Sequence, residues 1–348
     1  MRILIDINHP AHVHYFRNFI FRMNDLGHSF FIVNRDSIMI NQLLNEYGLA
    51  HRVRSSRPKK NSFVNSLVYL FRMIFDVFRY SQGKKIDLYL GFASPACSIV
   101  GWLRRKPVIL IDDTEHNSTN HSIYLPFCSV VLTPFYFTKK LGAKQISFQA
   151  FVEQFYINSD FNPTKILKEK SYCLIRFISY DARHDSEVKG IISYENKLKL
   201  VNNLSKKIRV YISYEGDEID EVLGGFHLDI KPSQMHSVIA GASLFITEGA
   251  TMGIEAGLMG VNYYYINPLK VGNVTFQAQK FNNAHEIDGN ILAENIDEVD
   301  FKDRDFDQQE LIENSTINPT DFLIWFVVNF PESKDIMLKD STYQYNFS

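Results

Sequence analysis

Cysteine is scarce in this chain, and the three that occur are Cys97, Cys128 and Cys173. None belongs to a CxxC pair, and each lies among apolar residues. A disulfide framework and a structural zinc site are therefore not expected, and we predict three buried free thiols.

Long apolar stretches are also absent. No run reaches the roughly 18 uncharged apolar residues that a membrane-spanning helix needs. The segment MRILIDINHP (1–10) contains an apolar run that is too short for a signal peptide and is broken by Asp6. The sequence therefore predicts a cytoplasmic protein.

Several catalytic motifs are missing as well. The chain has no GxxxxGK[ST], GxGxxG or GxSxG, so P-loop kinases, dinucleotide-dependent enzymes and α/β-hydrolases have no support. A DxD motif occurs in DRDFD (303–307), but in a polar acidic region and not after a strand, so no metal site is expected. The basic residues lack interleaved aromatic residues, and no nucleic-acid partner is expected.

The composition is that of a globular protein, with 45% hydrophobic and 22% charged residues, and 348 residues favour two domains. Residues 1–165 carry 20 Lys and Arg against 11 Asp and Glu, a net charge of +9, and residues 166–348 carry 17 against 28, a net charge of −11. A basic half can meet an anionic membrane or a phosphorylated substrate. Alternatively, the difference in net charge between the two domains has no functional meaning.

Short apolar strands alternate with helices, which predicts parallel doubly wound sheets covered on both faces. In the first domain, 1–160, we expect strands at 2–7, 29–34, 87–92, 107–112 and 129–134, and helices at 13–26, 38–47, 63–80 and 94–103. A polar linker, NSDFNPTK (158–165), precedes a second domain at 166–320. There we expect strands at 172–179, 208–213, 243–247 and 262–267, and helices at 190–207, 232–242 and 252–259. A closing helix and tail occupy 321–348.

Ligands of such sheets bind beyond the carboxyl ends of the strands, here in a predicted cleft between the domains. The turn after the strand SLFIT contains Gly249, Ala250 and Thr251, which would let a phosphate approach the backbone N–H groups at a helix start. Glu255, predicted in the first turn of that helix, could accept hydrogen bonds from a ribose diol. The same small residues also suit an ordinary tight turn.

The segment TEGATMGIEAGLMGV (247–261) resembles the donor-binding segment of GT-B-fold glycosyltransferases. It is also similar to the N-acetylglucosaminyltransferase of peptidoglycan synthesis and to UDP-N-acetylglucosamine 2-epimerases. The segments DINHPAHVHYF (6–16), DDTEH (112–116) and IRFISYDARHD (175–185) resemble a poorly characterised prokaryotic branch of this superfamily. The resemblance extends to about residue 290 and implies two Rossmann-like domains that bind a nucleotide-sugar without a metal or another cofactor.

Candidate catalytic residues follow from the loops of the first domain. The resemblance places His12 where GT-B transferases often carry a histidine, and an imidazole can accept a proton from a hydroxyl group. His9 and His12 could instead only cap the helix or bind phosphate. In DDTEH, crowded carboxylates raise one another's pKa, which suits acid–base chemistry. Related epimerases use a glutamate for catalysis near this position, and the sequence leaves this role open between Asp113 and Glu115. The segment could instead be only a solvated loop that caps a helix.

Further donor-side candidates lie in the second domain. Arg176 lies in an apolar strand and needs a partner, such as Asp181 or Asp185. His184 could reach the diphosphate or sugar, or this segment could form a structural ion-pair network. The resemblance implies that the backbone near Ile230 meets the nucleobase, and that Ser213 and Glu215 form another donor-side loop.

Residues 63–80, FVNSLVYLFRMIFDVFRY, are strongly apolar and contain Arg72 and Arg79, with RPKK (57–60) before them. They could form an interfacial helix that lies on an anionic membrane, which would place the protein at the inner face of the membrane. Alternatively, they could form a helix that packs on the first sheet.

We therefore expect a metal-independent glycosyltransferase of polysaccharide biosynthesis. It would move a sugar from a UDP-linked donor to a surface glycan or lipid-linked acceptor, with His12, Asp113 or Glu115 as the base. One alternative is a nucleotide-sugar 2-epimerase or hydrolase, which would turn over without an acceptor. Another is a non-catalytic protein that binds nucleotides or glycans.

Overall fold

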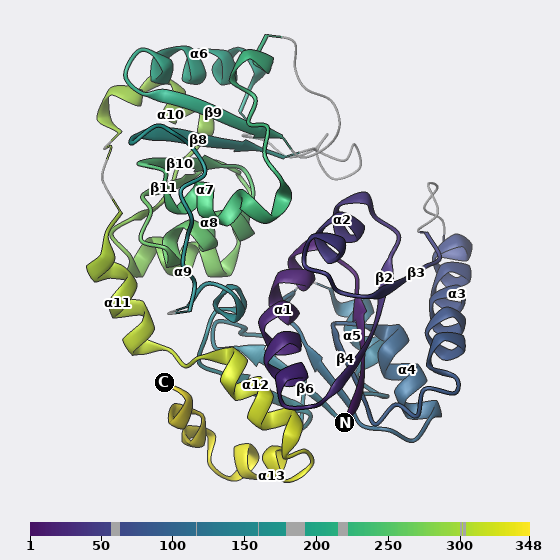
Figure 1. Cartoon of the computed structure of the whole chain (residues 1–348). Coiled ribbons are helices and arrows are strands. Elements are labelled where there is room, and N and C mark those ends of the chain that lie inside the picture. The colour runs from purple at the N-terminus through teal and green to yellow at the C-terminus, as the bar shows by residue number, and fades with distance from the viewer. Residues whose placement is uncertain are drawn as a thin grey trace. The chain divides into compact units, whose positions relative to one another are not determined.

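The computed structural model describes residues 1–56, 63–115, 117–158, 160–178, 192–214, 222–299, 301 and 304–348. The chain forms two compact units, which we call unit 1 and unit 2 (Figure 1). Unit 1 comprises Met1–Asn158 and Thr316–Ser348, and unit 2 comprises Ser159–Ser315. The segment predicted as a closing helix and tail, 321–348, thus belongs to unit 1 together with the five residues before it.

Unit 1 is built on a seven-stranded parallel sheet in the order β3-β2-β1-β4-β5-β6-β7. Its strands are short apolar runs, and the central ones are almost entirely buried because helices cover both faces. The strands are β1 (Arg2–Ile7), β2 (Ser29–Arg35), β3 (His51–Arg54), β4 (Leu88–Phe92), β5 (Val108–Ile111), β6 (Val130–Pro134) and β7 (Gln145–Phe148).

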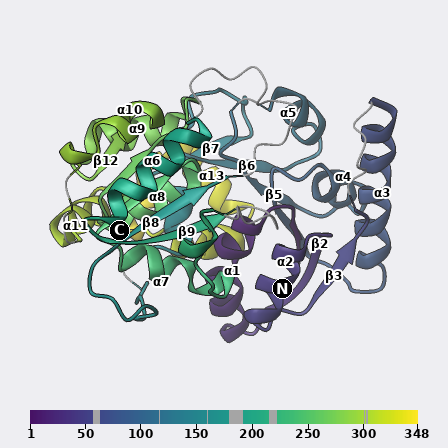
Figure 2. The ribbon, with the colours of Figure 1, turned by 90° about the horizontal axis from the view of Figure 1, so that it is seen from above.

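Helices α1 (Pro10–Asp25) and α2 (Ile38–Glu46) cover one face of this sheet (Figures 1 and 2). The other face is covered by α3 (Phe63–Ser81), α4 (Pro95–Leu103) and α5 (Ser118–Tyr124). After η1 (Val152–Phe155) the chain leaves for unit 2. It returns as α12 (Pro319–Val328), α13 (Glu332–Lys339) and η5 (Ser341–Phe347), with α12 packed on α1 and α13 on β7.

Unit 2 contains a five-stranded parallel sheet in the order β12-β11-β10-β8-β9. Its strands are β8 (Tyr172–Phe177), β9 (Arg209–Tyr214), β10 (Leu244–Thr247), β11 (Tyr263–Tyr265) and β12 (Ala284–Glu286). Helices α6 (Tyr194–Ser205) and α10 (Gly289–Glu294) lie on one face (Figure 1). The other face carries α7 (Met235–Ala240), α8 (Ala250–Leu258) and α9 (Gly272–Lys280). The remaining elements are η2 (Gly224–Phe226), η3 (Pro232–Gln234), η4 (Ile296–Glu298) and α11 (Phe306–Ser315).

The predicted fold class, two parallel doubly wound α/β sheets, is confirmed. The three cysteines are free and buried, as predicted. Strand β3 was not predicted, because His51–Arg54 reads as polar, and its Arg54 is buried only through an ion pair. The three-residue strand β12 and the short helices α9 and α10 carry too few apolar residues for a periodic pattern.

Candidate functional site

The sheet of unit 1 has its topological switch point between β1 and β4. The chain leaves β1 toward β2 on one side, whereas β4 leads toward β5 on the other side. The loops that follow β1 and β4 therefore diverge at this point, which is where doubly wound sheets bind ligands. The loop after β1 contains His9 and leads to His12, so the sequence-predicted histidines do lie at a favourable edge of the sheet.

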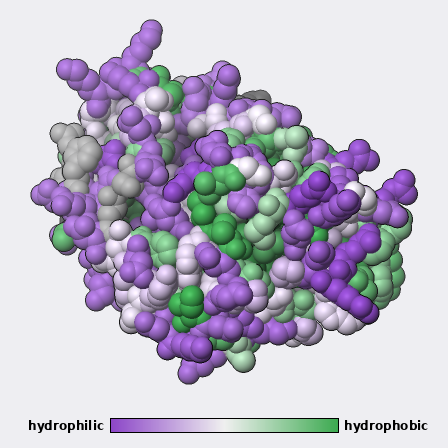
Figure 3. Space-filling view, turned by 60° about the horizontal axis from the view of Figure 1, so that its bottom comes forward, coloured by the Kyte–Doolittle hydropathy of each residue, from purple (hydrophilic) through white to green (hydrophobic). Residues whose placement is uncertain are grey.

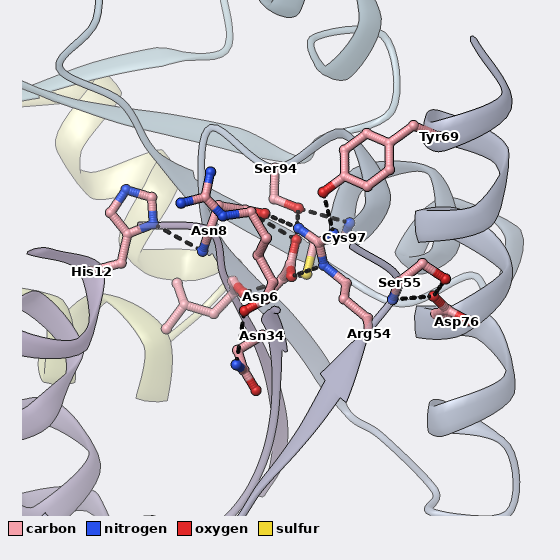
Figure 4. A network of polar contacts seen from close by, with 12 residues as sticks. Asp6, Asn8, His12, Asn34, Arg54, Ser55, Tyr69, Asp76, Ser94 and Cys97 are labelled. Carbon is pink, nitrogen blue, oxygen red and sulfur yellow. Dashed lines mark hydrogen bonds and ion pairs between the residues drawn. The ribbon is translucent and has the colours of Figure 1, made fainter. Parts of the chain in front are cut away.

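A buried polar network centres on Asp6, near the end of β1 (Figure 4). Arg54 Nε donates to Asp6 Oδ1 at 3.1 Å, and Arg54 also donates to the Tyr69 hydroxyl at 2.9 Å and to Asn8 Oδ1. Asp6 Oδ2 accepts from Ser94 Oγ at 2.6 Å and from Asn8 Nδ2 at 3.0 Å. Burial favours loss of the guanidinium proton, but Asp6 and Tyr69 outweigh burial and raise the pKa of Arg54. The network joins β1, β3, α3 and the start of α4.

Asn8 connects this network to His12. The Asn8 N–H donates to His12 Nδ1 at 3.4 Å, and the His12 ring stacks on Phe92 with 4.6 Å between centroids. Burial, and then the charges of His9 and Arg35, hold the pKa of His12 well below 6.5, so the ring is neutral at neutral pH. Because Nδ1 accepts the Asn8 N–H, the ring proton is on Nε2.

His9 is arranged in the same way. It is the N-cap of α1, and its Nδ1 accepts the Ala11 N–H at 3.3 Å. Burial, and then Arg35, lower its pKa. The rings of His9 and His12 are 5.8 Å apart. Each ring in this geometry therefore offers an Nε2–H donor, and the role of His12 as a base stays a prediction.

Asp112, at the end of β5, is a buried carboxylate held from three directions. The Tyr124 hydroxyl donates to its Oδ2 at 2.5 Å, His121 Nε2 lies 3.2 Å from the same oxygen, and the Thr114 N–H donates to Oδ1 at 2.9 Å. Burial raises the pKa of Asp112 even though these partners oppose it. Sequence reasoning missed His121 and Tyr124, because α5 is too short to give a periodic signal.

Asp113 and Glu115, which the sequence left as equal candidates, differ in the structure. The Glu115 carboxylate accepts both the backbone N–H and the hydroxyl of Thr138, so it braces its loop. Asp113 is half-buried and accepts from Thr114 Oγ1 at 3.1 Å. Burial, and then the neighbouring Asp112, raise the pKa of Asp113 to about 6. Its carboxyl group is therefore suited to take up and release a proton near neutral pH. His116 lies outside the described residues.

In unit 2 the switch point lies between β8 and β10, and Glu248 occupies it. Its side chain is fully buried, with Oε2 accepting the Ile178 N–H at 3.0 Å and Oε1 lying 3.1 Å from Lys197 Nζ of α6. The carboxylate thus ties the end of β10 to the end of β8. An apolar strand can end at a glutamate here because the charge is paired. Sequence reasoning did not give Glu248 this role.

The turn after Glu248 leads directly into α8. Thr247 Oγ1 accepts the Gly249 N–H at 2.9 Å, which closes the turn, and Gly249 is the N-cap of α8. Gly249, Ala250 and Thr251 are all partly exposed. Within the part of the chain that the structure describes, no acceptor pairs with the N–H groups of Ala250, Thr251 or Met252. The start of α8 is therefore open to an anion.

Glu255 lies in the second turn of α8, and not in the first turn as predicted, because the helix begins at Ala250 and not at 252. Its side chain is buried, and its Oε1 lies 3.3 Å from His236 Nε2 of α7. This contact fixes the position of the carboxylate behind the start of α8. Sequence reasoning missed His236.

Arg176 is paired within the sheet. Its Nη1 donates to Ser213 Oγ at 2.6 Å and to the Tyr214 carbonyl at 2.9 Å. These partners on β9 were not predicted, and the suggested Asp181 and Asp185 lie outside the described residues. Ser213 is itself buried.

Ile230 is half-buried between η2 and η3, and it stays a prediction for the nucleobase contact. His184 and Glu215 lie outside the described residues. Among the residues that are described, no cluster of three His, Cys, Asp or Glu side chains could hold a metal ion.

The two units are each a Rossmann-like parallel α/β sheet with polar groups at its switch point, the two-domain architecture of the GT-B fold class. The chain belongs to the DUF354 family, a protein family of unknown function, whose model matches residues 1–329. No curated protein matches it.

Solved structures support the fold class. The UDP-GlcNAc 2-epimerase from Methanocaldococcus jannaschii is similar with a TM-score of 0.62 and 9% identity, covering 90% of this chain and 99% of that one. The UDP-GlcNAc 2-epimerase from Neisseria meningitidis bound to UDP-GlcNAc has a TM-score of 0.60 and 12% identity, and the match covers 96% of this chain and 93% of that one. The glycotransferase of kitacinnamycin has a TM-score of 0.60 and 11% identity, and the match covers 92% of this chain and 98% of that one. At these identities the likeness shows the fold alone.

Proposed function

We propose that this protein is a glycosyltransferase that moves a sugar from a UDP-linked donor to a surface-polysaccharide or lipid-linked acceptor. The observation that carries this proposal is the open start of α8 in unit 2, where Gly249, Ala250 and Thr251 follow the switch point of the sheet. Backbone N–H groups and the positive end of the helix dipole favour a diphosphate there. Solved structures of this fold include one bound to UDP-GlcNAc.

In this proposal unit 2 holds the donor. The N–H groups of Ala250, Thr251 and Met252 and the Thr251 hydroxyl bind the diphosphate and stabilise its charge as it leaves. Glu255, oriented by His236, accepts hydrogen bonds from the ribose hydroxyls. The backbone near Ile230 contacts the base.

Unit 1 supplies the proton chemistry. An acceptor oxygen attacks the anomeric carbon, the bond from that carbon to the diphosphate breaks, and the acceptor proton passes to a carboxylate. Asp113 is the best candidate for that carboxylate, because its pKa is raised to about 6 and Glu115 is held by Thr138. His9 and His12 donate hydrogen bonds through Nε2 to oxygen atoms of the substrate.

A 2-epimerase of nucleotide-sugars is the second candidate. Two adjacent carboxylates, Asp112 and Asp113, could serve removal and return of a proton at C2 of the sugar, and epimerases are among the similar structures. Incubation with UDP-N-acetylglucosamine alone separates the two functions. An epimerase produces the epimer without an acceptor, whereas a transferase does not.

The donor site is tested by thermal unfolding with a panel of nucleotides and nucleotide-sugars. A ligand that binds only the folded protein raises the melting temperature. We expect UDP or a UDP-sugar to do so for the wild type, and Thr251→Val and Glu255→Ala to lose most of that shift. Glu294→Ala, at an exposed site on α10, is the matched control and should keep it. A wild-type response in Glu255→Ala would show that the ribose assignment is wrong. Tight UDP binding with no turnover under any acceptor would favour a non-catalytic binding protein.

A further inference from the structure

Helix α3 of unit 1 exposes a continuous apolar face. Its side chains Val64, Leu67, Val68, Phe71 and Phe75 are 65%, 44%, 42%, 63% and 60% exposed. Val64, Val68, Phe71 and Phe75 are spaced by four, three and four residues, and Leu67 lies three residues after Val64 and four before Phe71, so all five lie on one side of the helix. We call these five residues the α3 face. Figure 3 shows hydrophobic surface at the right-hand edge of the molecule, where α3 lies.

The opposite side of α3 is firmly packed. Val77 is fully buried, and the helix contacts α4, β2 and β3. The Tyr69 hydroxyl accepts from Arg54, and Asp76 accepts the N–H and the hydroxyl of Ser55 at 2.8 and 2.6 Å. The helix is thus held in the fold by its inner side, which packs on the sheet, as one of the two sequence-based alternatives predicted. Its other side faces outward. A shallow groove of about 480 Å³ crosses the exposed side, lined by Ser55, Val68, Phe71, Arg72, Phe75 and Asp76.

Positive charges accompany the α3 face. Arg72 and Arg79 are exposed and lie on the same side of the helix. Arg104, at the end of α4, lies 3.9 Å above the Phe78 ring and donates to the Phe78 carbonyl, and it is followed by exposed residues 105–106, Arg and Lys. The acidic side chain of this helix, Asp76, is already bonded to Ser55. Unit 1 as a whole has 21 Lys and Arg against 14 Asp and Glu, a net charge of +7.

We propose that the α3 face binds the surface of an anionic lipid bilayer. An amphipathic helix of this length can lie in the membrane plane, with its apolar side chains at the boundary of headgroups and acyl chains. The long side chains of Arg72 and Arg79 would reach the anionic headgroups. Among the described residues no helix is long and apolar enough to span a membrane, so the contact is with the surface.

A second copy of the chain fits this face less well. In a two-fold contact centred on Phe71, Arg72 would lie against its own symmetry mate, and like charges in close contact are unfavourable. A bilayer with acidic headgroups removes that repulsion. The inference rests on the α3 face and does not require the donor site of unit 2.

Sedimentation with lipid vesicles tests the inference. We expect the full chain to bind vesicles that contain phosphatidylglycerol, to bind phosphatidylcholine vesicles weakly, and to be released by salt. Phe71→Ser with Phe75→Ser, and separately Arg72→Glu with Arg79→Glu, should each lower binding by about tenfold or more. Ile38→Ser, which changes an apolar side chain that is 79% exposed on α2, is the control for the first pair. Lys199→Glu with Lys280→Glu, at exposed sites of unit 2, is the control for the second pair.

Four results would overturn the inference. They are no binding of the wild type to phosphatidylglycerol vesicles, equal binding to both kinds of vesicle, unchanged binding by both α3 double variants, and a concentration-dependent dimer that Phe71→Ser with Phe75→Ser dissociates. The UDP-induced rise in melting temperature, measured on the same variants, separates the two proposals. If that rise persists while vesicle binding fails in the wild type, only the membrane inference is lost. If the wild type binds vesicles without any nucleotide response, only the donor site is lost.

Discussion

The carboxyl edges of the two sheets have one structural feature in common but carry different chemical groups. In each unit, a buried carboxylate lies at the carboxyl end of a strand beside the switch point, with Asp6 one residue before the end of β1 and Glu248 directly after β10. Each carboxylate is paired with a basic side chain from another element, Arg54 or Lys197. Beyond that shared feature, unit 1 adds imidazole and carboxyl groups whose pKa values are shifted, whereas unit 2 adds small residues and open backbone N–H groups.

This difference indicates what each edge can do. Groups such as Asp113, with a pKa of about 6, can exchange protons near neutral pH. Backbone N–H groups at the start of α8 do not titrate and instead favour a fixed negative charge. The comparison therefore supports proton transfer in unit 1 and diphosphate binding in unit 2.

The largest expected effect is on the free energy of unfolding, when the basic partner of a buried carboxylate is replaced. Arg54→Met leaves Asp6 buried and without its ion pair, which should cost about 3–5 kcal/mol of unfolding free energy. Lys197→Met should cost less, about 1–2 kcal/mol, because Lys197 is 17% exposed and Glu248 keeps the Ile178 N–H. Urea unfolding measures both.

Both tryptophans, Trp102 and Trp325, lie in unit 1, so tryptophan fluorescence reports on that unit while circular dichroism reports on both. Lys270→Met, which removes the exposed lysine of a pair with Glu286, is the control and should have little effect. Equal costs for Arg54→Met and Lys197→Met would show that the partial exposure of Lys197 and the Ile178 N–H do not make the ion pair of unit 2 less important than that of unit 1.

The next effect concerns turnover. Asp113→Asn should lower kcat/KM by about 10²–10⁴-fold, because the proton acceptor is lost, and should leave the UDP-induced rise in melting temperature unchanged. In the wild type, kcat/KM should rise with pH around pH 6, as the Asp113 carboxyl loses its proton. Initial rates across pH, for the reaction found with the donor panel, measure both.

Glu115→Gln is the matched control in the same loop, and it should change stability more than rate because Glu115 braces Thr138. If Glu115→Gln abolishes turnover and Asp113→Asn does not, the two roles are reversed.

The smallest effect concerns pH and stability. The pKa of His12 is lower in the folded state than the usual 6.5, so the unfolded state binds a proton first as pH falls. The stability from this difference is complete above pH 6.5 and is lost below it, by about 1 kcal/mol at about pH 5.5. His12→Gln should remove this part of the pH dependence, as urea unfolding at several pH values would reveal. An identical pH dependence in the variant would mean that His12 titrates normally.

The sequence was sufficient for the inner strands of both sheets and for the position of the loops after them, but it did not predict the edge strands β3, β7 and β12. Apolar runs such as SLFIT and the small residues after them predicted a parallel strand and an open helix start, because local pattern and burial agree there. Asp6 was visible only as a break in an apolar run, since nothing nearby in the sequence indicates that Arg54, 48 residues later, pairs with it. Long-range pairs of this kind depend on strand order, which periodicity does not determine.

The roles within the loops were equally hidden. Asp113 and Glu115 are two residues apart and look alike in sequence, yet Thr138 holds only one of them. The role of His12 as a base stays a prediction, and the sequence did not indicate that the Asn8 N–H donates to its Nδ1. Both distinctions depend on where a backbone N–H points, and that is set by the fold.

Hydrogen–deuterium exchange at residues 250–252 tests the central claim most directly, because it reports on the backbone N–H groups proposed to bind the diphosphate. With a UDP-sugar bound, these amides should exchange more slowly, while those of the exposed α3 segment in unit 1 should not change. If a UDP-sugar binds and the amides at 250–252 exchange as fast as before, the start of α8 is not the diphosphate site.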